Sequence, residues 1–138
     1  ACAPAGLDIS VATPVGYDPC EQVVAEARLI AASTGSDVEI VNDPYLAVKD
    51  ADIVYSDVWT SMGQEDENAK RLEDFAGYQV NAQLVAAAKP DYIFMHCLPA
   101  HREEEVSTEV IDGPNSVVFQ QAGNRLHAQK AILVDLLS

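Results

Sequence analysis

Apolar residues follow two patterns that alternate along the chain. Short runs rich in Val, Ile and Tyr predict strands, and stretches with apolar residues every three or four positions predict helices. The predicted strands cover residues 7–13, 38–41, 51–59, 92–98 and 116–120. The predicted helices cover about 18–35, 44–49, part of 61–74, 81–88, a short stretch ending near 112, and a last stretch from about 124.

The first long helix has clear start and stop signals. Asp18 is in position to cap it, Pro19 suits the first helical position, and Glu21 occupies a capping-box position. Gly35 is placed to end the helix.

The alternation of strands and helices predicts an α/β fold, with three α/β/α layers and a mainly parallel, doubly wound, Rossmann-like sheet. No shift in composition marks a boundary, so residues 1–138 are expected to form one domain. Ligands of such sheets bind outside the carboxyl ends of the strands. This rule directs attention to residues 57–63, 96–102 and 120–125.

Composition and charge narrow the function classes. Apolar residues make up 49% of the chain and charged residues 22%, which is typical of a globular domain. The net charge of −14 argues against nucleic acid as a partner and favours a cationic ligand or simply a soluble surface. No apolar run is long enough to cross a membrane, so no membrane partner is expected.

The three cysteines are scattered and form no zinc-type spacing. They predict reduced thiols in a cytoplasmic protein. His96, Cys97 and His101 lie close in sequence, but adjacent strand residues project to opposite faces. We therefore expect no metal.

The segment at 57–63 has groups that suit an amino acid zwitterion. Asp57 can pair with an ammonium group, and Ser61 and the Met62 N–H can meet neighbouring polar atoms. The alternative is that Asp57 and Ser61 only cap the following helix.

The segments at 96–102 and 120–125 are also ambiguous when taken alone. Cys97 can be a nucleophile, a proton acceptor or a packing residue, and the bond before Pro99 can be cis. Arg125, which the pattern places at the opening of the last helix, can reach an oxyanion or carbonyl, or it can pair with a surface acid.

Four motifs in order nevertheless resemble one family, the ornithine carbamoyltransferases. They are ATPVGY at 12–17, DVWTSMG at 57–63, MHCLP at 95–99 and NRLHAQKA at 124–131. Within the wider transcarbamylase family, the Ser-Met-Gly segment points to ornithine. One departure is Gly123, where the family more often has Glu before Asn-Arg. We expect this change to have a small effect on the loop that positions Arg125.

The resemblance implies roles for individual residues. Asp57, Ser61 and the Met62 backbone would bind L-ornithine, with Cys97 near the reacting δ-amine. Cys97, Leu98 and Arg125 would bind carbamoyl phosphate, and Cys97 and Arg125 would be catalytic. The implied reaction transfers the carbamoyl group directly to the δ-amine, giving citrulline and phosphate in arginine metabolism, with no metal and no cofactor.

The resemblance also implies an incomplete enzyme. The carbamoyl-phosphate domain and the first strand of the ornithine domain are expected to be missing, and this chain is expected to be inactive alone. A homotrimer would be expected of the full enzyme. Two alternatives are a module that binds a basic amino acid without turning it over, and an interaction remnant whose unpaired strand edges associate with another chain.

Overall fold

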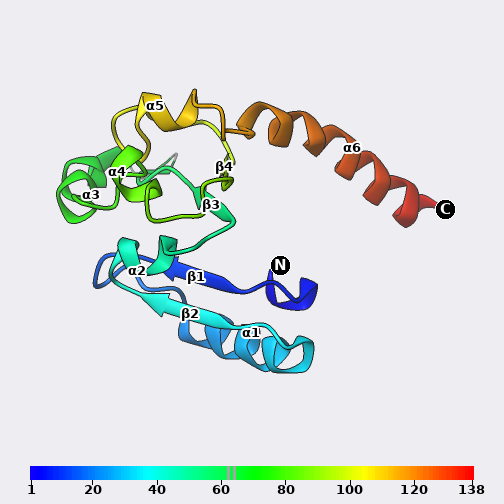
Figure 1. The fold of residues 1–138 in the computed structure, drawn as a ribbon. Coiled ribbons are helices and arrows are strands. Elements are labelled where there is room, and N and C mark those ends of the chain that lie inside the picture. The colour runs from blue at the N-terminus through cyan, green and yellow to red at the C-terminus, as the bar shows by residue number, and fades with distance from the viewer. Residues whose placement is uncertain (62, 64) are drawn as a thin grey trace. The chain divides into compact units, whose positions relative to one another are not determined.

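The structure is a computed structural model that describes residues 1–61, 63 and 65–138. It consists of two compact units, residues 1–49 and residues 50–138 (Figure 1).

The first unit is a β-α-β arrangement. Its elements are η1 (Ala3–Ala5), β1 (Ile9–Ala12), α1 (Glu21–Thr34), β2 (Val38–Val41) and α2 (Pro44–Val48). β1 and β2 pair in parallel, from Ile9 opposite Val38 to Ala12 opposite Val41. A small core forms where Ala31 of α1 packs with Val38 and Ala3.

The stop signal of α1 is confirmed, and its predicted start is wrong. Gly35 takes a left-handed conformation with φ of 77°, and its N–H donates to the Ala31 carbonyl. At the other end the helix begins at Glu21, because Cys20 has a non-helical ψ of 123°. The Asp18 carboxylate instead accepts from the Gly16 N–H at 3.3 Å, so it stabilises the preceding turn.

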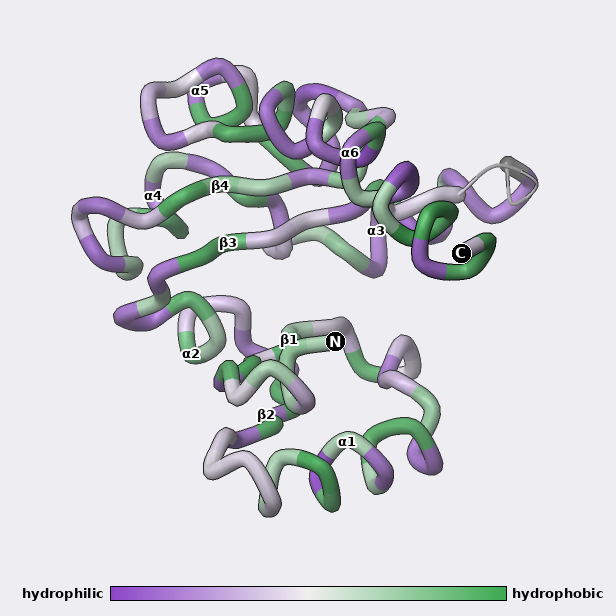
Figure 2. Tube along the Cα trace, turned by 90° about the vertical axis from the view of Figure 1, so that its right-hand side faces the viewer, coloured by the Kyte–Doolittle hydropathy of each residue, from purple (hydrophilic) through white to green (hydrophobic). Residues whose placement is uncertain are grey.

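The second unit contains the other two strands and five helical segments. Its elements are β3 (Ile53–Ser56), η2 (Glu65–Glu67), α3 (Asn68–Asp74), α4 (Ala82–Val85), β4 (Ile93–His96), α5 (Thr108–Ile111) and α6 (Val118–Leu137). β3 and β4 lie side by side in parallel, with Ile53 opposite Ile93 and Ser56 opposite His96 (Figure 2).

The predicted strand at 116–120 is wrong. Only one bridge forms, between Phe94 and Ser116, and α6 begins at Val118 instead of near residue 124. The Val-rich stretch favours a strand locally, but Val118 packs into the core as the first residue of a long helix and is only 1% exposed. Tertiary packing here overrides strand propensity.

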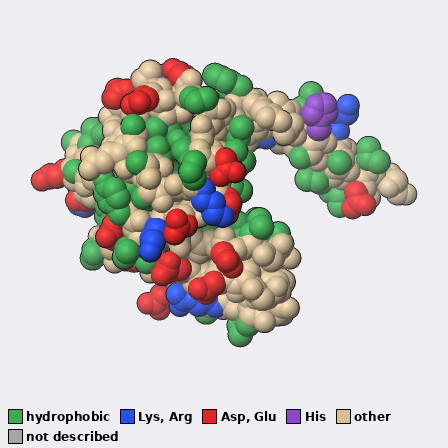
Figure 3. Space-filling model, in the orientation of Figure 1, with side chains coloured by type: hydrophobic (Ala, Val, Ile, Leu, Met, Phe, Trp, Pro, Cys, Tyr) green, Lys and Arg blue, Asp and Glu red, His purple; other side chains and the backbone are tan. Residues whose placement is uncertain are grey.

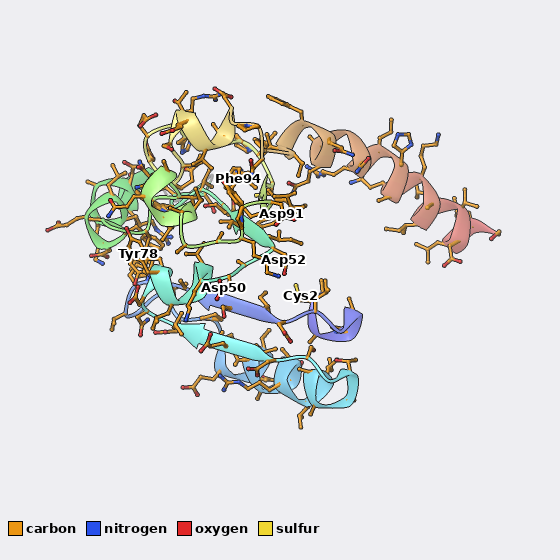
Figure 4. The ribbon with its side chains drawn as sticks, viewed as in Figure 1. Cys2, Asp50, Asp52, Tyr78, Asp91 and Phe94 are labelled. Carbon is orange, nitrogen blue, oxygen red and sulfur yellow. The ribbon has the colours of Figure 1, made fainter. Side chains whose placement is uncertain are left out.

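The core of the second unit surrounds Phe94, which is fully buried (Figure 4). Its apolar members come from β3, β4, α4, α5, the start of α6 and the isolated bridge between residues 80 and 106: Val54, Val80, Leu84, Val85, Phe94, Val106, Val110, Ile111 and Val118. Two polar side chains, His96 and Glu105, are also fully buried there. Buried polar groups of this kind need partners, so they define the chemistry of this unit.

α6 leaves the core after its first turns. Leu126, Ile132, Leu133 and Leu136 of this helix are exposed. Figure 3 shows hydrophobic side chains on the surface along α6. Among the helices that the structure describes, none combines the length and apolar character that a membrane span requires.

The α/β class and the parallel pairing are confirmed. The described strands form two parallel pairs, β1 with β2 and β3 with β4, and each pair keeps its strands in register along all four residues.

Gly113 and Gly123 provide a matched test of the packing in the second unit. A Cβ at Gly113 would lie 2.6 Å from the Glu109 carbonyl oxygen, whereas one at Gly123 would meet nothing within 4 Å. We expect Gly113→Ala to lower the free energy of unfolding by about 1–3 kcal/mol. We expect Gly123→Ala, in an exposed helix, to raise it by up to about 1 kcal/mol. Urea unfolding followed by circular dichroism measures both, and equal values for the two variants would contradict the packing described.

Candidate functional site

β3 and β4 end side by side, which brings the residues after them together. Since Ser56 lies opposite His96, Asp57 and Cys97 leave the two strands at the same carboxyl edge. The Cys97 Sγ donates a hydrogen bond to Asp57 Oδ1 at 2.9 Å. This hydrogen bond therefore joins two of the three segments that the sequence singled out.

Strand alternation sorts these side chains onto two faces. Phe94 and His96 point into the core, where both are buried. Tyr55, Asp57 and Cys97 occupy the alternate positions and share the other face. Asp57 is exposed and Cys97 half-buried, so a ligand can reach both.

Cys97 is a thiol and not a thiolate at neutral pH. Burial raises its pKa above the ordinary value for cysteine, and the adjacent Asp57 carboxylate raises it further. Hydrogen bonding with Tyr55 acts in the opposite direction. A protonated Cys97 is a weak nucleophile, but it can donate to Asp57 and hold that carboxylate in place.

Gln121 connects the first turns of α6 to both strands. Its Oε1 accepts from the His96 N–H at 3.0 Å, and its Nε2 donates to the Tyr55 hydroxyl at 3.3 Å. A longer fifth strand would have continued the hydrogen-bond ladder beside β4. The Gln121 side chain bonds to the β4 backbone there instead. Burial and the neighbouring Cys97 raise the pKa of Tyr55, so its hydroxyl remains protonated.

The turn after β4 has an unusual backbone. Leu98 adopts a left-handed φ of 56°, and the Leu98–Pro99 bond is cis, an outcome that the sequence allowed. The Leu98 N–H donates to His96 Nδ1 at 2.9 Å. On the other side of that imidazole, Nε2 lies 3.4 Å from Glu105 Oε1, and both side chains have no exposed surface.

His96 is neutral in this environment. Burial lowers its pKa below 6.5, and the nearby carboxylates of Glu105 and Asp57 only partly oppose this effect. Glu105 Oε1 also accepts from the His101 N–H at 2.6 Å.

The segment after Asp57 is held against α3. Arg71 Nη1 donates to the Trp59 carbonyl at 2.9 Å, and the Trp59 ring stacks on Phe75 with centroids 5.6 Å apart. Ser61 follows and is exposed at the same end of the unit. Met62, the third residue expected to bind ornithine, lies outside the described residues.

Arg125 lies within α6 and does not open it, which corrects the sequence-based placement. It is exposed. It follows Gln121 by four positions, so the two side chains leave the helix on the same face. The described contacts do not join Arg125 to Cys97.

Within the part of the chain that the structure describes, one group of side chains has metal-ligand chemistry: His101, Glu104 and Glu105. The ligand atoms of these three side chains lie within 4.8 Å of one another. A bound zinc ion would lie about 2.0–2.2 Å from each of its nitrogen and oxygen ligand atoms. Glu105 Oε1 is already bonded to the His101 N–H. The expectation of no metal therefore stays a prediction.

Three residues of this network were missed from the sequence: Tyr55, Glu105 and Gln121. Tyr55 reads as an ordinary strand residue. Glu105 ends a run of three glutamates, and no sequence signal distinguishes it from its exposed neighbour Glu103. Gln121 lay inside a segment that the strand-end rule had marked, so its position was a usable signal.

The opposite effects of Asp57 and Tyr55 on the thiol predict opposite changes in Cys97 reactivity. We expect Asp57→Asn to lower the thiol pKa and speed alkylation by iodoacetamide about three- to tenfold at neutral pH. Tyr55→Phe should slow it. The rates are measured with Cys2 and Cys20 replaced by Ser, so that only Cys97 reacts. A change in the same direction for both variants would contradict this account of the thiol.

Comparisons with known proteins place this geometry in a family. Residues 1–136 match the family described as aspartate/ornithine carbamoyltransferase, Asp/Orn binding domain. The chain is 62% identical over 133 residues to an ornithine carbamoyltransferase of Listeria monocytogenes, covering 96% of this chain and 42% of that protein. It is 61% identical over 136 residues to that of Bacillus subtilis, covering 99% of this chain and 43% of the relative.

A solved structure agrees with the sequence matches. The ornithine carbamoyltransferase from Pyrococcus furiosus superposes with a TM-score of 0.90 at 59% identity, over 95% of this chain and 42% of that one. The chain thus spans less than half the length of the relatives that it matches. With a match running over nearly all of its residues, the chain belongs to the aspartate/ornithine carbamoyltransferase family and corresponds to its Asp/Orn binding domain.

Proposed function

We propose that this chain supplies the ornithine-binding half of an ornithine carbamoyltransferase. The observation that carries the proposal is the Cys97–Asp57 hydrogen bond at the carboxyl edge of two adjacent parallel strands. An exposed carboxylate there suits the ammonium groups of a basic amino acid. The named relatives, which are ornithine carbamoyltransferases, supply the substrate class.

In the proposed reaction, the δ-amine nitrogen of L-ornithine attacks the carbamoyl carbon of carbamoyl phosphate. The new C–N bond forms, the bond from that carbon to the phosphate oxygen breaks, and citrulline and phosphate result. The δ-ammonium must first lose a proton to expose its lone pair. The Cys97–Asp57 pair assists that proton transfer, and departing phosphate is the final proton acceptor.

The remaining roles are assigned to residues of the three marked segments. Asp57, Ser61 and the Met62 backbone bind the α-amino and carboxylate end of ornithine. The Leu98 carbonyl accepts from the carbamoyl amide, and Arg125 stabilises negative charge on the carbamoyl oxygen. For Arg125 this proposal requires α6 to be held closer to Cys97 when the rest of the enzyme is present.

The wider setting is part of the same proposal. The full enzyme includes a carbamoyl-phosphate domain, forms a homotrimer and works in the cytoplasm without a metal or cofactor. All three cysteines are free, in keeping with a reducing compartment.

Binding is tested on the chain itself by amide-resolved NMR with and without L-ornithine. We expect shifts at residues 57–63 and around Cys97, and their loss in Asp57→Asn. The matched control is Asp91→Asn, which removes an equal charge just before β4, at the amino end of the strand. Equal binding by both variants would show that Asp57 has no role in the site.

Turnover is tested in a chimera that carries this chain in place of the matching 136 residues of the Bacillus subtilis relative. We expect citrulline formation that depends on both substrates, and a loss of about 10²–10³ in kcat for Arg125→Ala. Ornithine binding with no turnover in the chimera would favour a binding module. Association of the chain without any ornithine binding would favour an interaction remnant.

A further inference from the structure

The turn that presents Cys97 contains a backbone conformation that must be held in place. Leu98 has a φ of 56°, in a region that costs a non-glycine residue roughly 1–2 kcal/mol. Its N–H donates to His96 Nδ1 at 2.9 Å. The imidazole is thus bonded to the backbone two residues ahead of its own position.

That hydrogen bond fixes the protonation state of the ring. A ring nitrogen that accepts from an N–H carries no proton, so the proton of the neutral imidazole lies on Nε2. This atom faces Glu105 Oε1 at 3.4 Å, which is long for a hydrogen bond. The other titratable groups near the ring are Asp57 and His101, and the ring itself is fully buried.

The backbone of His96 and the neighbour of its ring are both held in place. The backbone N–H of His96 donates to Gln121 Oε1 at 3.0 Å, and the His101 N–H donates to Glu105 Oε1 at 2.6 Å. The ring cannot rotate to place Nδ1 elsewhere without leaving the Leu98 N–H unpaired, which costs a buried donor about 1–3 kcal/mol.

We propose that His96 is a positioning residue that acts as a neutral imidazole with its proton on Nε2. Through Nδ1 it holds the Leu98 amide, and thereby fixes the turn that directs Cys97 Sγ at Asp57 and orients the Leu98 carbonyl. It does not relay protons, since Nδ1 is occupied and the ring points into the core, away from the face that carries Asp57. The consequence for turnover rests on the proposed function, and the consequence for the turn does not.

The tautomer is tested on the unaltered chain by ¹⁵N NMR of the imidazole rings. We expect His96 to keep an unprotonated Nδ1 and a protonated Nε2 from about pH 6 to 8, and the exposed His101 and His127 provide the comparison spectra. A proton on His96 Nδ1 at any pH in this range would overturn the proposal.

Two substitutions separate positioning from simple space filling. His96→Asn places an amide oxygen where Nδ1 lies, so it can still accept from Leu98. His96→Gln is closer to His in size but places its amide near the position of Nε2. A packing role alone would make Gln the better replacement, whereas positioning makes Asn the better one.

The first measurement on these variants is Cys97 alkylation, with Cys2 and Cys20 replaced by Ser. We expect His96→Asn to react within about threefold of the unaltered thiol, and His96→Gln to react about tenfold faster, because Cys97 is released from Asp57. Equal rates for the two variants, or Gln closer to the unaltered chain than Asn, would refute positioning.

The second measurement is the steady-state rate in the chimera. We expect His96→Gln to lower kcat about tenfold or more with KM for ornithine within about threefold, and His96→Asn to recover most of kcat. Equal kcat in the two variants would count against the proposal. If the chimera without these changes is inactive, the proposed function fails, and the tautomer and alkylation experiments still decide the role of His96.

Discussion

The parallel register of β3 and β4 is the constraint on which the candidate site depends. With Ser56 opposite His96, strand alternation sends Phe94 and His96 into the core and sends Asp57 and Cys97 together to the other face. A slip of one residue would exchange the two faces of β3. It would bury residues that are now exposed, such as Ile53, and would remove Asp57 from Cys97. The core packing that fixes the register therefore also fixes the chemistry.

The sequence predicted the features that local pattern controls. Alternating periodicity predicted the α/β class, and the strand-end rule marked the segments that contain Asp57 and Cys97. Prediction from the sequence failed where tertiary contacts decide the structure. Strand propensity at 116–120 is outweighed by the long helix that buries Val118, so Arg125 moves into α6. The burial of Glu105 beside His96 depends on a loop path that no local pattern encodes.

The electrostatics divide the proposed work between two parts of an enzyme. This chain has a net charge of −14, and the Asp57 carboxylate at its site is exposed. Such a surface attracts an amino acid with ammonium groups and repels a phosphate ester. Among the site residues, Arg125 is the cation, and it lies on a helix whose apolar side is exposed. Under the proposed function, an anionic co-substrate requires cations in addition to those of this chain.

The elevated pKa of Cys97 has a consequence for the durability of the protein. Peroxide oxidises thiolates and spares thiols, and the first product, a sulfenic acid, leads on to irreversible states. By keeping Cys97 protonated, the Asp57 carboxylate and partial burial slow that chemistry at an accessible sulfur. A cysteine that serves to orient a neighbour, and not to attack a substrate, can thus persist through oxidative stress that would inactivate a thiolate enzyme.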